Sequence, residues 1–454
     1  MKHKGTLLIF AYECYPYNRT GSAIGAQRPY QFAKHLSELG WKVIVLCCDK
    51  EQRRKLKKQD LIPETNRLFL EYKLELKNKS YIIVPLPSLK SHGWVDWVWS
   101  LSVKQGPGNT YIAKGFPFNV FRKTATVYNQ LMHGDYSWSW VPVADQFAQL
   151  VVEQQSVQIL VGEHSPDAGI ILADRFSRRH RIPWIADFRD PALRFLTGYF
   201  ARLYKGVVQR IVSSASCTLT VSDYWSNLDE KLFNKKSHVV MNGYDQEFFD
   251  KIQAHQFSAF TVSYFGSFDQ AYQDILPSLE AFLCLLKQNN YASNIQLFYR
   301  GLAYKEFMKH CKDVGIPSAH LNVEGFCTRE ETAAYMKGSQ VLLIYSVSLD
   351  KTTNIYEKQG VYPGKVFEYI GANRPILLIP SDHNIMAALI GGEHRGMATS
   401  SVQEAKCFLQ EKYNNWCNGD FIPTIHHNDE VYSRKYQAIQ LDRILSDTLG
   451  IIHP

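Results

Sequence analysis

The sequence predicts an α/β protein built on parallel sheets. Apolar runs of strand length, such as residues 7–11 and 41–47, alternate with amphipathic stretches such as residues 27–39, and glycine-containing loops lie between them. A strand followed by a helix and another strand implies a parallel sheet with right-handed crossovers. The chain has 454 residues, 45% of them hydrophobic and 21% charged, which is enough for two or three domains with full cores.

The first half of the chain repeats this pattern. Further strands are expected at residues 81–87, 158–162, 182–186 and 217–221, with helices at about 168–179 and 223–232. Ligands of such sheets bind beyond the carboxyl ends of the strands. The loop that follows the first strand, with Gly21, Ser22 and Gly25, lies at that edge. It is not G-x-G-x-x-G, so a phosphate loop and a loop without a ligand both remain open.

A second series of the same kind begins near residue 261. Strands are expected at residues 262–265, 295–299, 341–345 and 375–379, with helices at about 275–286 and 430–449. The first strand of this series ends at Gly266, and the second ends at Arg300. Both halves of the chain therefore start with a strand, a glycine loop and a helix.

Composition limits the classes of partner and compartment. The net charge of +8, from 51 basic and 43 acidic residues, favours anionic partners without choosing among nucleotides, nucleic acids and membranes. The nine cysteines are odd in number and form no C-x-x-C pair, so we expect reduced buried thiols and no zinc site. No run is long enough to span a membrane, and residues 6–11 are too short for a signal peptide. We expect a cytoplasmic protein.

Residues 88–145 are the least regular part of the sequence. They combine aromatic residues, such as Trp94 and Trp97, with basic residues such as Lys104 and Arg122. This mixture can form an ordinary aromatic core, can dock on an anionic bilayer, or can stack on single-stranded nucleic acid. We favour the core, keep peripheral membrane contact as the alternative, and expect no nucleic-acid binding.

The stretch 362–378 predicts a loop, a short helix and a buried strand. Lys365 falls in the first turn of the helix, where free N–H groups and the helix dipole favour an anion. Glu368 lies three residues further on and shares a face with Lys365. Together they can hold the diphosphate and the ribose hydroxyls of a nucleoside diphosphate. From these two residues alone, an exposed ion pair is the preferred interpretation.

The wider pattern resembles a known family. Val323-Glu324-Gly325-Phe326, the run 341–345 and the stretch 362–378 are similar to the donor-binding half of GT-B glycosyltransferases, in particular the family-4 type that makes bacterial surface polysaccharides. That fold has two facing Rossmann-like domains with a cleft between them. The resemblance implies that Lys365 contacts the donor diphosphate and Glu368 the ribose.

The same resemblance implies further donor contacts. In the first half it covers residues 7–50, and it implies that the loop of Gly21, Ser22 and Gly25 approaches the transferred sugar and the diphosphate. In the second half it extends to about residue 380. There it assigns donor contacts to Gly266 and Phe326.

Residues 182–191, Ile-Pro-Trp-Ile-Ala-Asp-Phe-Arg-Asp-Pro, closely resemble a signature of the polysaccharide subgroup. The signature implies a catalytic role in the cleft for Asp187 and Arg189. His164, after the preceding strand, resembles the family's histidine near the reacting carbon of the sugar. A structural Asp–Arg network and a structural histidine are the competing interpretations.

The sequence departs from the family at two positions. The family often carries an arginine after the first strand of the donor domain, whereas Gly266-Ser267-Phe268-Asp269 offers no basic residue, and Arg300 is the replacement suggested by its position at a strand end. The family's paired glutamates lie eight residues apart, but the residue eight before Glu368 is Gly360. The second departure puts the sugar contact in doubt.

The resemblance implies a domain division and a reaction. We expect an acceptor domain over residues 1–250 with the insertion at 88–145, a nucleotide-sugar domain over 251–425, and a C-terminal helix over 426–454 that returns to the first domain. We expect transfer of a sugar from a nucleotide sugar to a glycan or lipid-linked acceptor, with retention and without a metal or another cofactor, since no Asp-x-Asp motif is present. A nucleotide-sugar epimerase and a non-catalytic nucleotide-binding scaffold are the alternatives.

Overall fold

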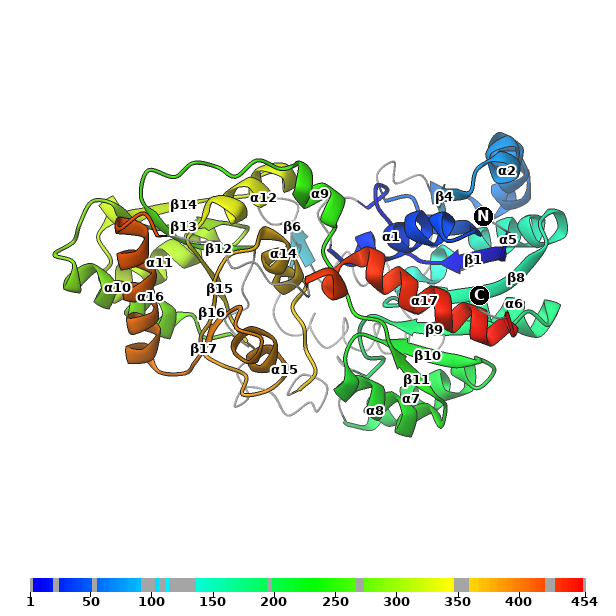
Figure 1. Cartoon of the computed structure of the whole chain (residues 1–454). Coiled ribbons are helices and arrows are strands. Elements are labelled where there is room, and N and C mark those ends of the chain that lie inside the picture. The colour runs from blue at the N-terminus through cyan, green and yellow to red at the C-terminus, as the bar shows by residue number, and fades with distance from the viewer. Residues whose placement is uncertain are drawn as a thin grey trace. The chain divides into compact units, whose positions relative to one another are not determined.

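The computed structural model describes residues 3–18, 24–50, 55–90, 103–105, 111–113, 136–193, 198–266, 273–346, 359–420 and 429–451. The chain divides into two compact units. Unit 1 comprises residues 1–240 and 438–454, and unit 2 comprises residues 241–437. Each unit contains a large parallel sheet with helices on both faces (Figure 1).

Unit 1 is organised around a seven-stranded sheet in the order β11-β10-β9-β8-β1-β2-β4. Its strands are β1 (Gly5–Phe10), β2 (Trp41–Cys48), β4 (Tyr81–Leu86), β8 (Val157–His164), β9 (Trp184–Phe188), β10 (Cys217–Thr220) and β11 (Ser237–Val239). The chain runs outward from β1 through β2 to β4 and then returns to β8 on the other side of β1. The β1–β8 pair is therefore the switch point of the sheet, where open parallel sheets bind ligands.

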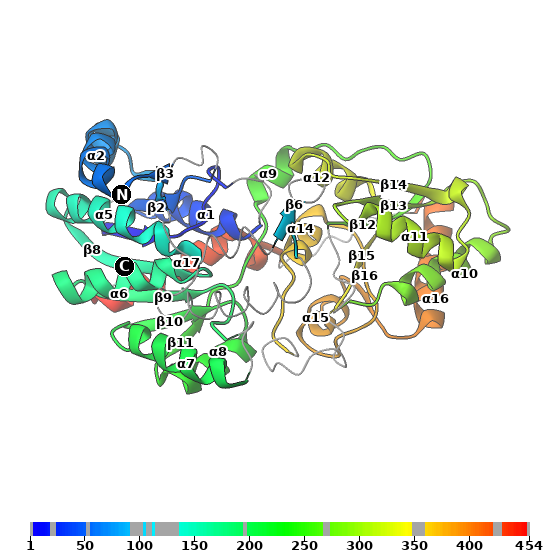
Figure 2. The same ribbon diagram turned by 180° about the vertical axis from the view of Figure 1, so that it is seen from behind.

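Helices cover both faces of this sheet. They are α1 (Ile24–Glu38), α2 (Leu61–Asn78), α5 (Val141–Gln154), α6 (Ala168–His180), α7 (Gly198–Val212), α8 (Asp223–Phe233) and the part of α17 (Arg434–Leu449) from Ala438 onward. Leu8 and Phe10 of β1 pack in one core with α2, α5, α6 and α7. Leu7 and Ile9 pack in another with α1 and α17. Figure 1 looks onto the side of α1 and α17, and Figure 2 onto the side of α5 and α6.

Smaller elements complete the described part of unit 1. They are β3 (Lys55–Leu56) paired with β5 (Ser88–Leu89), β6 (Val103–Gln105) paired with β7 (Tyr111–Ala113), and the 3-10 turns η1 (Lys58–Asp60) and η3 (Tyr136–Ser139).

Unit 2 repeats the architecture with six strands in the order β14-β13-β12-β15-β16-β17. The strands are β12 (Phe260–Phe265), β13 (Ile295–Arg300), β14 (Leu321–Glu324), β15 (Val341–Ile344), β16 (Ile376–Leu378) and β17 (Gly396–Ala398). Its switch point is the β12–β15 pair, by the same reasoning as for unit 1.

The helices of unit 2 again form two layers. The longer ones are α9 (Gln246–Lys251), α10 (Leu276–Gln288), α11 (Tyr304–Val314), α12 (Arg329–Gly338), α14 (Gly364–Ala372) and α16 (Val402–Cys417). The short ones are η4 (Ser318–His320), α15 (Ile385–Ala387), η6 (Ala388–Gly392) and η7 (Asp429–Tyr432). Tyr264 packs with α10, α11 and α16, whereas Phe265 packs with α12 and α14. Helix α14 ends at Asn373, which takes a left-handed conformation with φ of 55°.

The structure adds helices that the sequence analysis does not anticipate. Helix α2 is not expected because its exposed Ile62, Leu70 and Leu74 obscure the helical period of its buried residues. Helix α5 begins at Val141, inside the stretch expected to be irregular. Most of residues 88–145 lies outside the described residues, so the interpretation of its aromatic and basic residues stays a prediction. No described helix has both the length and the apolar composition needed to cross a bilayer.

Candidate functional site

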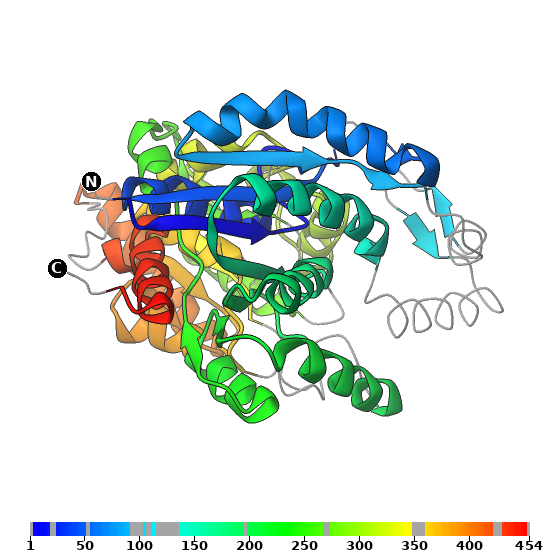
Figure 3. The ribbon, with the colours of Figure 1, turned by 90° about the vertical axis from the view of Figure 1, so that its right-hand side faces the viewer.

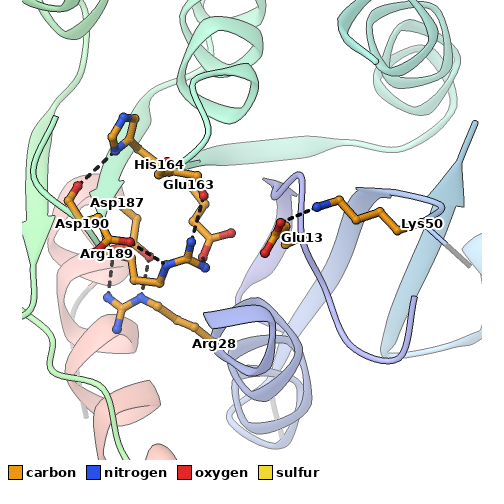
Figure 4. A network of polar contacts seen from close by, with 9 residues as sticks. Glu13, Arg28, Lys50, Glu163, His164, Asp187, Arg189 and Asp190 are labelled. Atoms are coloured by element: carbon orange, nitrogen blue, oxygen red, sulfur yellow. Dashed lines mark hydrogen bonds and ion pairs between the residues drawn. The ribbon is translucent and has the colours of Figure 1, made fainter. Parts of the chain in front are cut away.

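The carboxyl edge of the unit 1 sheet gathers charged side chains from α1 and from the ends of several strands (Figure 4). Strands β8 and β9 pair so that Glu163 lies beside Asp187 and His164 beside Phe188. Arg189 follows β9, and its backbone N–H donates to the carbonyl oxygen of His164 at 3.0 Å. The structure thus brings together the three residues that the sequence analysis assigns to catalysis.

Asp187 is held by an arginine of α1. Arg28 donates from Nε and Nη2 to the two carboxylate oxygens of Asp187, both at 2.8 Å, and the two side chains are 1% and 3% exposed. The two parallel hydrogen bonds of such a pair fix the relative orientation of the two side chains as well as their separation. The pair anchors the start of α1 to the end of β9, so Asp187 positions the site.

Arg189 lies under the first turn of α1. Its Nη2 donates to the backbone oxygen of Ser165 at 2.9 Å, and its Nη1 and Nε lie 3.4 Å from Glu163 and Asp190. A Cβ on Gly25 would come within 2.4 Å of Nη1, so a larger residue there would require the guanidinium to move. The guanidinium and the positive end of α1 therefore converge, an arrangement that favours an anion.

The buried position of Glu163 favours the uncharged form of its carboxyl group beside this positive charge. Burial raises the pKa of its carboxyl group to about 8, although Arg189 acts in the opposite direction. Further along the same edge, Glu13 forms an ion pair with Lys50 (Figure 4). Gly21 and Ser22, the other two residues of the predicted glycine loop, lie outside the described residues.

His164 is held at both ring nitrogens. Its Nδ1 lies 3.0 Å from the backbone oxygen of Asp190, and its Nε2 lies 3.0 Å from Oδ1 of Asp167. Both neighbouring atoms are oxygens that can accept a hydrogen bond. The other carboxylate oxygen of Asp167, Oδ2, accepts a hydrogen bond from Tyr204. The ring is 6% exposed. This environment suits a residue that orients a ligand or its neighbours.

Asp229 of α8 is a functional candidate that the sequence analysis misses. Its side chain is 1% exposed, and neither carboxylate oxygen has a hydrogen-bond partner among the residues that the structure describes. Burial raises its pKa to about 8, with His164 acting in the opposite direction. An ordinary helical aspartate gives no sequence signal, because its burial comes from the packing of α8 against the sheet.

In unit 2, Lys365 lies at the switch point. Its Nζ donates to the hydroxyl of Tyr264 at 2.6 Å and lies 4.2 Å from the centre of that ring. The ring of Tyr264 is 4.5 Å from that of Tyr345, which follows β15, so the amine lies where β12 and β15 end. A Cβ on Gly266, whose φ is +97°, would be 3.4 Å from Nζ. Lys365 and Gly266 thus lie side by side at this switch point.

The amine of Lys365 changes its protonation state near neutral pH. Burial lowers the pKa of its amine to about 7, and Glu368 opposes the shift. Burial also raises the pKa of Glu368, against the effects of Arg329, Arg434 and Lys365. Three basic residues of unit 2 therefore act on one carboxylate. The two arginines were not predicted from the sequence, because each is distant from Glu368 along the chain.

Arg300 is bound to its own neighbourhood. Its guanidinium donates to the backbone and side-chain oxygens of Asn322 at 3.1 and 2.9 Å, lies 3.1 Å from Glu324, and stacks on Phe298 at 4.0 Å. These contacts hold the Arg300 side chain against β14. Strand β13 separates β14 from β12, the strand that carries Tyr264, the partner of Lys365. The backbone oxygen of Arg300, however, accepts from the N–H of Gly266 at 2.9 Å. Phe326, two residues beyond β14, is 64% exposed.

No protein-family model and no curated protein sequence matches this chain, but solved structures do. Sucrose-phosphate synthase from Thermosynechococcus elongatus has a TM-score of 0.56 at 10% identity, covering 99% of this chain and 100% of its own. Anabaena HepE in complex with UDP and glucose has a TM-score of 0.54 at 11% identity, covering 98% and 100%. WaaG, a glycosyltransferase involved in lipopolysaccharide biosynthesis, has a TM-score of 0.50 at 13% identity, covering 96% and 99%.

These likenesses show the fold. The chain has the GT-B fold of two Rossmann-like domains, as its resemblance to GT-B glycosyltransferases implies. The narrower assignment to family 4 and the roles of the individual site residues stay predictions.

Proposed function

We propose that this protein is a glycosyltransferase that moves a sugar from a nucleotide-sugar donor to an acceptor hydroxyl. The observation that carries the proposal is the position of Lys365, at the start of α14 and beside Gly266 at the β12–β15 switch point. A diphosphate there would meet free helix N–H groups, the glycine backbone and the lysine. HepE, which shares the fold, is described in complex with UDP and glucose.

The reaction needs a stabilised leaving group. The bond between the anomeric carbon and the diphosphate oxygen breaks, the acceptor oxygen bonds to that carbon, and the hydroxyl proton passes to the departing diphosphate. Lys365 in its ammonium form stabilises the charge that develops on the diphosphate, and the helix end adds to it. We propose retention of the anomeric configuration, which the resemblance to family 4 implies. We also propose that no metal is needed, because a fixed cation and N–H groups supply the stabilisation that a metal ion otherwise gives.

The acceptor side belongs to unit 1 in this proposal. His164, Asp187 and Arg189 orient the acceptor or the transferred sugar, and Asp187 acts through Arg28 as a positioning residue. The convergence of Arg189 with the start of α1 suits a phosphate or another anionic group. We propose a glycan or lipid-linked acceptor of cell-surface polysaccharide synthesis at the membrane surface, a class that WaaG exemplifies within the same fold.

The donor site is tested by thermal stabilisation with a panel of nucleoside diphosphates and nucleotide sugars. A ligand at a hundred times its dissociation constant adds about 2.7 kcal/mol to the free energy of unfolding. We expect one nucleotide to stabilise the wild type, and Lys365→Ala and Glu368→Gln to reduce the shift. Lys309→Ala, an exposed lysine on α11, is the matched control and keeps the full shift. Equal losses in Lys365→Ala and the control would remove Lys365 from the donor site.

Turnover separates the enzyme classes. Incubation of the protein with the stabilising nucleotide sugar, with and without glycan acceptors, should give a glycosylated product only when an acceptor is present. An isomerised sugar from the donor alone would instead identify a nucleotide-sugar epimerase. Binding without any product, across a broad acceptor set, would identify a nucleotide-binding scaffold.

A further inference from the structure

Helix α2 carries three large apolar side chains on its solvent side. Ile62, Leu70 and Leu74 are 58%, 67% and 70% exposed. With about 100° per residue in an α-helix, they fall within a sector of roughly 120°. The packed side of the helix, with Thr65, Leu68, Phe69 and Leu76, is centred about 120° from the middle of this sector. The exposed apolar residues are therefore not needed to hold the helix in place.

Basic residues share this sector. Lys73 and Lys77 are exposed and project between Ile62 and Leu70 on the helical wheel. Lys55, Lys57 and Lys58, just before the helix, are also exposed.

The acidic residues of α2 lie on another side of the helix and are already paired. Arg67 lies 3.2 Å from both Glu64 and Glu71, and Lys79 lies 2.5 Å from Glu75. Among the described residues, no carboxylate lies within ion-pair distance of Lys73 or Lys77. The exposed sector is thus apolar and cationic without acids.

The position of α2 leaves this sector open. In Figures 1 and 3 the helix, in blue, forms the outer margin of unit 1, and no other described element of unit 1 lies over its outer side. We name Ile62, Leu70, Leu74, Lys73 and Lys77 the α2 face.

We propose that the α2 face docks the protein on an anionic lipid bilayer. The leucines and the isoleucine would enter the boundary between headgroups and acyl chains, while the lysines lie at the lipid phosphates. This combination of an apolar and a lysine-rich side is typical of helices that lie in a membrane interface.

A second copy of the chain is a poorer occupant. A symmetric contact through this face would bring Lys73 and Lys77 of one copy against those of the other, where like charges repel. Lysines also interrupt the apolar side chains, so the face lacks a continuous apolar centre. An anionic bilayer accommodates both kinds of side chain, because the apolar residues meet acyl chains and the lysines meet lipid phosphates. The docking does not depend on the proposed glycosyl transfer, although it would hold such an enzyme near a lipid-linked acceptor.

The test is binding of the full chain to vesicles, measured by flotation. We expect binding to vesicles that contain phosphatidylglycerol and little binding to phosphatidylcholine alone. Lys73→Gln with Lys77→Gln should weaken binding about 25-fold, from about fivefold for each lysine, and high salt should have a similar effect on the wild type. Leu70→Ser with Leu74→Ser should weaken it by roughly tenfold for each leucine.

Matched controls come from unit 2. Leu302 is 74% exposed, and Lys309 and Lys312 are exposed on α11, so Leu302→Ser and the pair Lys309→Gln with Lys312→Gln should leave vesicle binding unchanged. All variants alter exposed side chains, and circular dichroism checks that they fold.

Three results would overturn the proposal. The first is absence of wild-type binding to anionic vesicles, and the second is an equal loss in the α2 and control variants. The third is self-association that Leu70→Ser with Leu74→Ser abolishes, without vesicle binding, which would assign the face to a second copy. Lys365→Ala should bind vesicles like the wild type, so failure of docking and failure of the donor site are distinguishable.

Discussion

At the scale of single residues, the candidate site of each unit contains groups whose pKa values are shifted by burial. Lys365, Glu163 and Asp229 all have pKa values moved toward neutrality, and in each the largest cause is loss of water. Buried groups with such values occur often in functional sites. The three residues therefore offer pH-dependent tests.

Lys365 should take up a proton when a diphosphate binds. Its pKa of about 7 leaves most of the amine neutral at pH 8 in the free protein, and a bound dianion restores the ammonium form. Calorimetry with UDP, in two buffers of different ionisation enthalpy, should show uptake approaching one proton at pH 8 and less at pH 6. Lys365→Arg is the control, since arginine stays charged. The same uptake in both proteins would show that the proton goes elsewhere.

Asp229 should make the protein less stable as the pH rises. Its folded pKa of about 8 lies above the ordinary value, so the stability present at low pH is lost between about pH 4 and 8. Asp229→Asn removes this titration. As the pH rises over that range, the free energy of unfolding of the variant minus that of the wild type should increase by up to about 1.4 kcal/mol per pH unit. Urea unfolding at pH 5 and pH 8 measures the difference, and Asp223→Asn, exposed on the same helix, should show little pH dependence. A constant difference would contradict the raised pKa.

At the scale of elements, the Arg28–Asp187 pair joins α1 to β9. Removing one partner leaves the other charge buried, so Arg28→Ala should lower the free energy of unfolding by about 3–5 kcal/mol. Arg28→Met together with Asp187→Leu should recover part of this loss, because no charge then remains buried. Denaturant unfolding measures both variants.

The control for this pair is a more exposed one in the same unit. Arg178 lies 2.7 Å from Asp174 with its side chain 52% exposed, so Arg178→Ala should cost less than about 1 kcal/mol. Similar costs for Arg28→Ala and Arg178→Ala would mean that the Arg28–Asp187 pair does not hold α1.

At the scale of the whole molecule, unit 1 is completed by the end of the chain. Ala438, Leu441 and Leu445 of α17 are fully buried against β1 and β2. Asp442 accepts from Nε1 of Trp41 at 2.7 Å and pairs with Lys4 at 2.7 Å. Unit 1 therefore cannot close its core until the C-terminal helix is present.

Leu441→Ala tests this dependence. It should lower the stability of unit 1 by about 2–5 kcal/mol, because it leaves a cavity in a packed core. Hydrogen exchange should then accelerate in β1 and β2 and stay unchanged in β12 and β13. Leu449→Ala, at a half-buried position of the same helix, should have a smaller effect. Equal acceleration in both units would show that the part of α17 from Ala438 onward does not stabilise unit 1 alone.

The sequence by itself determined what depends on local spacing. Strand and helix alternation, the place of Lys365 in a first turn, and the position of Asp187 and Arg189 at a strand end all follow from residues close together in the chain. Such patterns reflect the helical or strand period of the backbone and the burial of one face, and both can be read from the spacing of apolar residues along the chain.

Only the tertiary structure decided the partners and the charge states. Arg28 meets Asp187 across 159 residues, and Lys365 meets Tyr264 across 101. The isolation of Asp229 and the exposed apolar residues of α2 depend equally on what packs nearby. Desolvation and long-range contacts are properties of the folded chain. Local spacing therefore does not reveal which of these residues are buried, which are paired and which are exposed.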